Sequence, residues 1–256
     1  METLRATTRQ RAVRATALVL LTVLFLSGCA STPPQPEPDA WDPAEPVNRD
    51  VYTFNETLDA WVAKPLADAY VVVTPGFARD GVTNFFDNLG EPANALNNTL
   101  QGKPGAGVRD TGRFLINTTV GIVGLLDVAT PMGLESSNED FGQTLAVWGT
   151  PEGMYLMVPA MGPSTTRDVV DYPVAFATNP ITYVAAPVAV PLYVLDLVNT
   201  RANLESANRF RNQAALDSYT FTRSAYRQYR NGLIWDGDPP EEDFFDDLDT
   251  EQDVEW

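Results

Sequence analysis

Apolar residues recur at helical spacing through most of the chain, and this spacing limits the fold more than any other feature. The first stripe consists of Val47, Val51, Phe54, Leu58 and Trp61. Two similar stripes are Val82, Phe85, Phe86 and Leu89, and Leu216, Tyr219, Arg223, Tyr226 and Arg230. Steps of three and four residues place side chains on one face of an α-helix. Because period-two alternation is scarce and hairpin-turn signals are weak, the sequence predicts a mostly α-helical fold.

Proline and glycine punctuate this pattern, which predicts many short amphipathic helices rather than a few long ones. Two segments, residues 114–129 and 181–198, are unusually apolar. The first is shorter than the roughly 20 residues that a membrane-spanning helix needs. Pro187 and Pro191 are expected to break the second, since a proline inside a helix costs about 3 kcal/mol. Each segment is predicted either to be a buried core helix or to belong to a set of short helices that lie in or along one membrane leaflet with apolar surface turned to lipid.

The single cysteine, Cys29, follows an apolar run near the N-terminus. Four arginines precede the uncharged residues 15–26, a pattern typical of a signal peptide. The run ends in LSGC, which resembles the lipoprotein box of bacteria, where the cysteine is acylated after the leader is removed. We therefore predict a signal peptide over residues 1–28 and a lipid anchor on Cys29. Ala30 follows in place of Asp, which in similar lipoproteins favours the outer membrane, with the protein facing the periplasm.

Composition excludes several classes of function. The leader holds four of the 17 basic residues and one of the 34 acidic ones, so a chain starting at Cys29 has a net charge near −20. Such a chain is a poor ligand for nucleic acid. It contains no histidine and no second cysteine, the usual general base and metal ligands. The sequence therefore predicts no enzyme, no cofactor and no metal site.

Four regions divide the chain. After residues 1–28, residues 29–41 are rich in proline and small polar residues, and are predicted to form an extended tether. Residues 42–235 form the helical domain. Residues 236–256 carry eleven carboxylates and no basic residue, and are predicted to be disordered because like charges repel. A calcium site there is a weaker alternative, since the spacing fits no EF-hand loop.

Five segments within residues 42–230 resemble the MlaA family, also called VacJ, of outer-membrane lipoproteins. They are DPAEPVNRDVYTFNETLD from Asp42, NFFDNLGEPANALNNTLQG from Asn84, RFLINTTVGIVGLLDVA from Arg113, GLESSNEDFGQTLAVWGTPEGMYLMVPAMGPSTTRD from Gly133, and DSYTFTRSAYRQYR from Asp217. The sequence departs from the family pattern at Ala44, Pro46 and Met154. The first two departures bear on how the first helix begins.

The resemblance implies one ring-like or wedge-like, membrane-associated helical domain that surrounds a channel. It further implies that phospholipid mislocalised to the outer leaflet passes through this channel to a soluble, MlaC-like periplasmic carrier, which maintains outer-membrane lipid asymmetry. Trimeric porins are the implied partners at the outer membrane. Residues that match the family motifs and for which we expect structural roles are Asn48, Arg49, Phe141, Gly142, Gln143, Gly162, Pro163, Ser164, Arg167 and Asp168.

A lipid path needs apolar surface for the tails and polar groups for the headgroup. Candidates for the path are Phe114, Val120, Gly121, Val123, Gly124, Leu125, Val190 and Leu192. The glycines either bring lipid-facing helices together or permit tight core packing. Arg113, Arg167 and Arg201 are headgroup candidates because guanidinium matches phosphate; the alternative for each is an ion pair. Asn48 and Arg49 are expected to cap and pin the first helix, and Ser164 or Thr165 to cap a short helix after a tight turn.

Two other functions remain as alternatives. The first is a structural envelope lipoprotein that tethers components and carries no lipid. The second is a lipid hydrolase with a serine nucleophile in the turn around Ser164. The absence of histidine and of a G-x-S-x-G elbow argues against the hydrolase.

Overall fold

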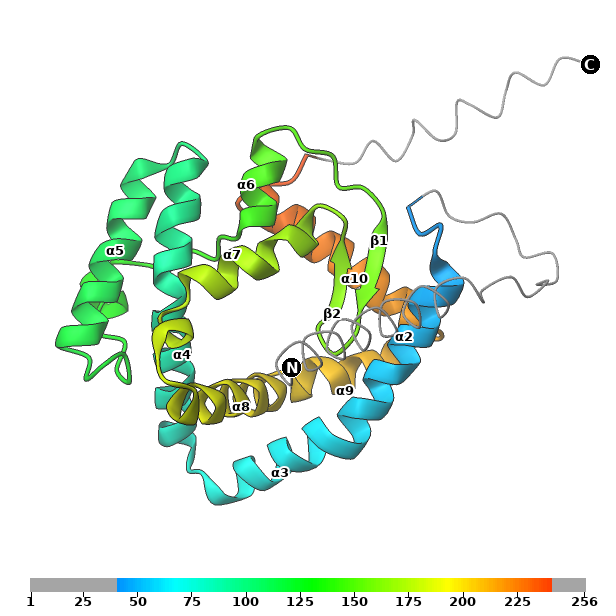
Figure 1. The fold of residues 1–256 in the computed structure, drawn as a ribbon, viewed down its shortest axis with the longest axis horizontal. Coiled ribbons are helices and arrows are strands. Elements are labelled where there is room, and N and C mark those ends of the chain that lie inside the picture. Colours follow the sequence, from blue (N-terminus) through cyan, green and yellow to red (C-terminus); the bar gives the residue numbers. More distant parts are fainter. Residues whose placement is uncertain (1–40, 241–256) are drawn as a thin grey trace, which may run out of the picture. The chain divides into compact units, whose positions relative to one another are not determined.

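The structure is a computed structural model that describes residues 41–240. The α-helices are α2 (Glu45–Leu58), α3 (Lys64–Val73), α4 (Gly76–Leu100), α5 (Pro104–Thr119), α6 (Phe141–Val147), α7 (Asp171–Thr178), α8 (Ala186–Asn203), α9 (Glu205–Ala214) and α10 (Ser218–Ile234). The strands are β1 (Tyr155–Val158) and β2 (Gly162–Thr165), and the short helical turns are η1 (Asp59–Ala63), η2 (Thr130–Met132), η3 (Asp168–Val170) and η4 (Pro180–Tyr183). The prediction of a mostly α-helical fold is confirmed (Figure 1). The predicted leader, Cys29, most of the tether, and the tail from residue 241 lie outside the described residues.

The first helical stripe forms one continuous stretch, in which α2 passes through the π-turn η1 into α3. Helix α2 begins at Glu45, and the carbonyl of Ala44 accepts the amide of Asn48 at 3.0 Å. Pro46 lies in the first turn, where its missing N–H costs no hydrogen bond. Both departures from the family pattern are therefore compatible with a regular helix start.

Helices α4 and α5 pack along each other as an antiparallel pair (Figure 1). At 25 residues, α4 is longer than the expected short helices, and it continues through Gly90 and Pro92. Only one backbone hydrogen bond is lost at Pro92, and packing against α5 along the helix offsets it.

The first apolar segment is helical only at its start, which belongs to α5, and the rest is a loop that neither alternative predicted. Helix α5 ends at Thr119, and a loop of left-handed residues follows, with φ of +55° at Ile122, +59° at Val123 and +88° at Gly124. The amide of Gly124 donates to the carbonyl of Asn117 at 2.8 Å and closes the loop back on the helix end. Glycine reaches positive φ without strain, which suits Gly124, whereas Ile122 and Val123 are β-branched residues held at a strained positive φ.

The expectation that Pro187 and Pro191 break the second apolar segment is correct only near Pro187, where the turn η4 ends at Tyr183 and α8 begins at Ala186, and it is wrong at Pro191. Helix α8 runs from Ala186 to Asn203 with Pro187 in its first turn and Pro191 inside it. The amide that Pro191 lacks would bond to the carbonyl of residue 187, so the loss is confined to the helix start. Within residues 41–240, no helix combines the length and the apolar character that crossing a bilayer requires.

A β-hairpin replaces the simple turn expected around Ser164. Strands β1 and β2 pair antiparallel, with Tyr155 opposite Thr165 and Val158 opposite Gly162. The turn places Ala160 at φ +60°, a strained position that sequence patterns do not indicate. Asn55 on α2 holds it: its side-chain oxygen accepts the Ala160 amide at 2.7 Å, and its side-chain nitrogen donates to the Val158 carbonyl at 3.0 Å.

The hairpin lies on a small apolar cluster formed by Tyr155, Met157 and Tyr219, against which Trp41, Val51, Tyr52 and Tyr226 pack. Helix α3 packs against α8, and α8 packs against α4. Helix α4 in turn contacts α5, α6 and α7, while α10 contacts α6, α9 and β2. These contacts bring the two apolar segments of the sequence onto neighbouring elements, because α8 and the loop after α5 both adjoin α4.

Candidate functional site

Burial in residues 41–240 is inverted with respect to a water-soluble domain. Nineteen polar or charged side chains are buried, against eight apolar ones. Large apolar side chains are instead exposed, among them Trp61 (80%), Val72 (85%) and Phe77 (80%). Soluble proteins bury mainly apolar residues and rarely expose extended apolar patches, whereas membrane contacts require such patches. The surface of this domain therefore fits an apolar medium.

Three exposed apolar surfaces account for much of this pattern. The apolar loop comprises Val120, Ile122, Val123, Leu125 and Leu126. The α3 surface comprises Trp61, Val62, Leu66, Val71, Val72, Val73 and Phe77, and the α8 surface comprises Val188, Val190, Val194 and Leu197. Of the residues predicted to line a lipid path, Val120, Val123, Leu125 and Val190 are exposed on these surfaces, Phe114 and Leu192 are half-buried, and Gly121 and Gly124 are buried. The structure thus places half of the set on accessible apolar surface.

The two glycines of this set pack the apolar loop rather than bring two helices together. A Cβ on Gly124 would lie 2.8 Å from the Cβ and Nδ2 of Asn88 on α4, and φ at Gly124 is +88°. A Cβ on Gly121 would lie 2.2 Å from the carbonyl oxygen of Leu126. The glycines allow the loop to fold tightly on itself and to lie against α4, so the exposed apolar side chains start directly beside that helix.

Between α4 and α5 lies a layer of paired polar side chains, which we call the polar layer. Nδ2 of Asn98 donates to Asp110 at 2.7 Å, and Nδ2 of Asn88 donates to the hydroxyl of Thr118 at 2.9 Å. The layer forms because Asn88, Glu91 and Asn98 on α4 face polar residues of α5 that include Asp110, Arg113 and Asn117, each set at helical spacing. Buried polar groups are stable only when they are paired in this way.

Arg113 is at the centre of the polar layer. Its Nε lies 2.7 Å from Glu91, and its two terminal nitrogens contact Thr130 at 2.9 Å, Asp127 at 3.4 Å and the carbonyl of Leu134. Burial opposes its positive charge, but the Glu91 and Asp127 carboxylates outweigh this and raise the pKa of Arg113. The structure therefore places this headgroup candidate in an ion-pair network whose acceptors belong to the protein.

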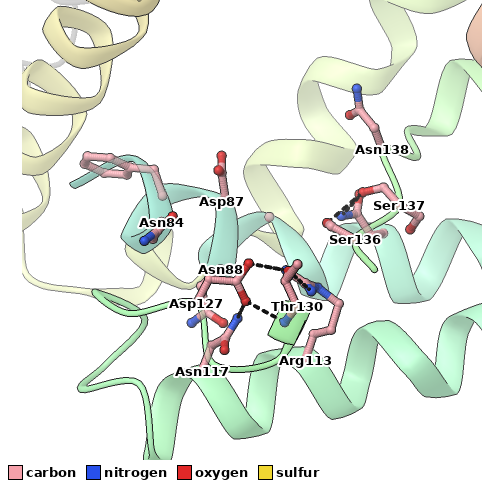
Figure 2. A pocket seen from close by; sticks show the side chains of 13 residues that line it. Asn84, Asp87, Asn88, Arg113, Asn117, Asp127, Thr130, Ser136, Ser137 and Asn138 are labelled. Atoms are coloured by element: carbon pink, nitrogen blue, oxygen red, sulfur yellow. Dashed lines mark hydrogen bonds and ion pairs between the residues drawn. The ribbon is translucent and has the colours of Figure 1, made fainter. Parts of the chain in front are cut away.

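A pocket of about 490 Å³ opens beside the polar layer, and we call it the α4 pocket. Figure 2 shows its lining, which includes Asn84, Asp87, Asn88, Arg113 and Asp127. In that view the Asp87 carboxylate stands apart from the cluster of Asp127, Thr130 and Arg113. Burial raises the pKa of Asp87, and the negative charges of Glu91, Asp196 and Asp127 raise it further. Among the charged residues that line the α4 pocket, two are acidic (Asp87 and Asp127) and one is basic (Arg113).

The other two arginines predicted to meet a headgroup also bind carboxylates. Arg201 on α8 donates to both oxygens of Asp59, at 2.5 and 3.0 Å, and to Glu205 at 3.0 Å. Nε of Arg167 lies 2.8 Å from Asp168, while its Nη2 is buried without a hydrogen-bond partner in the described residues. Arg201 also lines a smaller pocket of about 340 Å³ beside Val71 and Val72. Their role at a headgroup stays a prediction.

The family model described as MlaA lipoprotein matches residues 40–232, which is most of the chain. The chain belongs to the MlaA lipoprotein family. Relatives include the protein named "Intermembrane phospholipid transport system lipoprotein MlaA" of Shigella flexneri, 36% identical over 230 residues, which cover 88% of this chain and 90% of the relative. The protein of the same name in Escherichia coli strain K12 is 35% identical over 235 residues, with the same coverage.

A solved structure from a study described as "Structural basis for maintenance of bacterial outer membrane lipid asymmetry" has a similar fold. The TM-score is 0.67 at 32% sequence identity, and the match covers 75% of this chain and 98% of the solved one. Sequence and fold thus agree, and the predicted family is confirmed.

Two MlaA-family motif residues on α2 attach this helix to distant segments. Asn48 donates to Asp42 at 2.8 Å and to the Tyr155 carbonyl at 3.1 Å, and its oxygen accepts the Met157 amide at 2.9 Å. Arg49 binds Glu45 and Asp217, each at 2.7 Å. Asn48 thus lies inside α2 and bonds to β1, and it does not cap the helix as predicted. The N-cap residue of α2 is Ala44, which makes no side-chain capping bond.

The longest MlaA-family motif surrounds a second buried network. Arg230 on α10 binds Asp140, which caps α6 by accepting the Gln143 amide at 2.9 Å. A Cβ on Gly142 would come within 2.6 Å of Asp168 and 2.8 Å of Arg230, so only glycine fits. Motif residues thus hold α6 against α10 and η3.

The remaining motif residues lie in the hairpin and the turn after it. Gly162, Pro163 and Ser164 form β2, and the hydroxyl of Thr165 accepts the Asp168 amide at 3.1 Å, where η3 begins. The amide of Phe141 donates to Asp171 at 2.9 Å. Thr165 was predicted to cap a short helix; its hydroxyl does accept the first amide of η3, although the N-cap residue of this turn is Arg167.

Sequence reasoning missed the acidic and amide residues of the polar layer and the α4 pocket. Glu91, Asp87 and Asn88 carry no motif signal individually. The spacing of polar residues was a usable signal. Asn84, Asn88 and Glu91 follow one another at steps of four and three residues, on the face of α4 that carries no aromatic stripe. A polar stripe at helical spacing is normally read as the solvated face, which is why it was not recognised as buried.

Proposed function

We propose that this protein removes mislocalised phospholipids from the outer leaflet of the outer membrane. In this proposal the lipid moves along an amphipathic path in residues 42–235 and passes to a soluble, MlaC-like periplasmic carrier. The names of the relatives from Shigella flexneri and Escherichia coli support intermembrane phospholipid transport. The observation that carries the proposal is the inverted burial, in which apolar side chains are exposed and polar ones are enclosed by the same helices.

The energetics of lipid transfer explain why such a surface is needed. A phospholipid with two sixteen-carbon chains exposes some thirty CH₂ groups, so moving it bare through water costs on the order of 25 kcal/mol at about 0.8 kcal/mol each. Helix α4, which carries the polar layer, contacts α8, and its Asn84 and Asn88 contact the apolar loop. During transfer the acyl tails would stay in contact with the apolar side chains of the loop and of the α8 surface, and the headgroup would stay in contact with polar groups of the protein.

The position of the protein in the envelope is part of the same proposal. An acylated Cys29 would anchor the chain in the inner leaflet of the outer membrane with the domain facing the periplasm, and a trimeric porin would be its partner there. The family resemblance supports this arrangement. With several acyl chains on the cysteine, anchoring is firm, since each buried CH₂ contributes about 0.8 kcal/mol.

Native mass spectrometry of the detergent-extracted lipoprotein tests the proposal. We expect phospholipid bound to the protein, and a porin trimer in the same preparation. In parallel, phospholipid in the outer leaflet of intact cells is measured with a membrane-impermeant label in strains with and without the gene, and should rise in its absence. A lipid-free protein whose removal leaves the outer leaflet unchanged would favour the alternative of a structural tether. Accumulation of lysophospholipid on incubation would instead indicate a hydrolase.

A further inference from the structure

We propose that the α4 pocket binds the primary ammonium group of an ethanolamine-type phospholipid and favours it over phosphatidylglycerol. This inference rests on the proposed transport function and adds a headgroup preference to it. The pocket offers hydrogen-bond acceptors and negative charge, which suit an ammonium group. Phosphatidylglycerol has no ammonium group and carries a net negative charge, which the pocket repels.

Unused acceptors on α4 carry the argument. Asn84 donates its amide to the Leu125 carbonyl at 3.3 Å, which leaves its side-chain oxygen available. Asp87 lines the pocket, and its carboxylate has no hydrogen-bond or ion-pair partner within residues 41–240. Asn88 is only 3% exposed, and its side-chain oxygen accepts no hydrogen bond from the described residues. These three residues lie on adjacent turns of one helix face.

The main donors in the pocket, in contrast, already have protein acceptors. Arg113 directs its guanidinium to Glu91, Asp127, Thr130 and the Leu134 carbonyl. One N–H of Asn88 Nδ2 donates to the hydroxyl of Thr118. A ligand that enters the α4 pocket therefore meets acceptors, and an ammonium group, with three N–H donors and no acceptor, complements them.

Charge points to the same ligand. Asp87 is surrounded by Glu91, Asp127 and, across on α8, Asp196, and Arg113 is the opposing cation. Burial also raises the pKa of Asp196, while a hydrogen bond from Thr200 lowers it. Three carboxylates near Asp87 against one arginine leave excess negative charge, which a bound cation relieves and which repels an anionic headgroup.

The apolar loop provides the complementary site for the tails. Its Leu125 carbonyl accepts from Asn84, and its Gly124 lies against Asn88, so the loop borders the pocket. Val120, Ile122 and Val123 are each more than half exposed on this loop. A lipid with its ammonium group in the pocket can therefore place acyl chains on these side chains. The volume of about 490 Å³ lies in the range of small-molecule sites and exceeds the need of an ethanolamine group.

A competition experiment tests the headgroup preference. The full lipoprotein in detergent is given equimolar ethanolamine, choline and glycerol phospholipids with identical chains, and bound lipid is counted by native mass spectrometry. Ethanolamine lipid is expected to exceed glycerol lipid about tenfold, as one charge-assisted hydrogen bond allows. Choline lipid should fall between them, because its cation lacks N–H donors.

Asp87→Asn preserves size and removes the charge, and is expected to bring ethanolamine and glycerol lipids close to parity. Asp80→Asn makes the same change at an exposed position of α4 that does not line the pocket, and should leave the preference intact. Circular dichroism melting checks that both variants fold. Equal binding of all three lipids by the unmodified protein, or an unchanged preference in Asp87→Asn, would overturn the inference and leave transport standing. Absence of any bound phospholipid would overturn both.

Discussion

Nε of Arg113 on α5 lies 2.7 Å from Oε1 of Glu91 on α4, and the two side chains are only 5% and 1% exposed. This ion pair joins α4 and α5 through charge rather than through apolar contact. The strength of such a pair depends on both partners, because a single buried charge without its counter-ion is very costly.

Glu91→Ala is therefore expected to destabilise the protein by about 3–5 kcal/mol, since Arg113 loses its main counter-ion. Urea unfolding of the detergent-purified protein measures the effect. The control is Asp68→Ala, which removes the exposed Lys64–Asp68 pair at 3.0 Å and should cost less than about 1 kcal/mol. Equal effects of the two substitutions would show that the polar layer does not hold α4 and α5 together.

Gly124→Ala is expected to destabilise the apolar loop by about 1–3 kcal/mol, because alanine is strained at positive φ and its Cβ would clash with Asn88. The melting temperature should fall, and limited proteolysis should cleave near residue 124 more readily. Gly105→Ala is the matched control, since no atom lies within 4 Å of the added Cβ at this position in the first turn of α5. Identical melting curves for both variants would contradict the tight packing of the loop.

Val123→Asp is expected to impair lipid transport while the protein still folds. Val123 is 59% exposed, so a carboxylate there disturbs little internal packing but makes the apolar loop costly for acyl chains. Outer-leaflet phospholipid in cells carrying the variant should rise toward the level of the deletion strain. Gln228→Asp, on the exposed face of α10, should behave as the unmodified protein. Normal lipid asymmetry with Val123→Asp would exclude this loop from the lipid path.

Asp217 is expected to contribute to acid stability. A hydrogen bond from Arg49 lowers the pKa of Asp217 to about 2, with further hydrogen bonds from Thr220. The pKa of an Asp in the unfolded chain is about 4. The contribution of Asp217 to the free energy of unfolding is therefore complete above that pH and is lost as the pH falls toward 2. Both side chains are partly exposed, so the effect should be modest and should shrink in high salt.

Asp217→Asn tests this, because the amide oxygen can still cap α10 by accepting the Tyr219 amide, as Asp217 does at 2.9 Å. Its melting temperature should lie below that of the unmodified protein at pH 6, and the difference should vanish between pH 4 and pH 2. Asp50→Asn, at an exposed position of α2, should show no such trend. A difference that persists at pH 2 would mean that the cap, and not the charge on Asp217, is what the substitution changes.

Helical spacing was sufficient to predict α2, the middle of α4 and most of α10, because the stripes containing Val47, Val82 and Tyr219 each cover several turns. It failed at the apolar loop, where an apolar run suggests a helix but Ile122, Val123 and Gly124 adopt left-handed backbone conformations. It failed again at the hairpin, because Asn55 stabilises the strained residue Ala160 from 105 positions away. Local patterns contain no information about such a partner.

The three arginines show the same limit for the candidate site. Guanidinium chemistry suggested a phosphate ligand, yet the partners found are Glu91 for Arg113, Asp59 for Arg201 and Asp168 for Arg167. The first two carboxylates lie 22 and 142 residues away in the sequence. In an acidic chain the number of possible carboxylate partners is large, and only the fold decides which of them a given arginine meets.

The amino-acid sequence by itself determined the helical class, the membership of the MlaA family and the apolar segments available for lipid. These follow from residue type and short-range spacing, which the chain carries whatever its tertiary contacts. The tertiary structure alone decided which face of each helix is enclosed, because enclosure depends on the neighbour that packs there. It placed the polar face of α4 against α5, because buried polar groups need hydrogen-bond or ion-pair partners and α5 supplies them. It left the apolar side chains of the loop after α5 exposed, because no neighbouring element within residues 41–240 covers them.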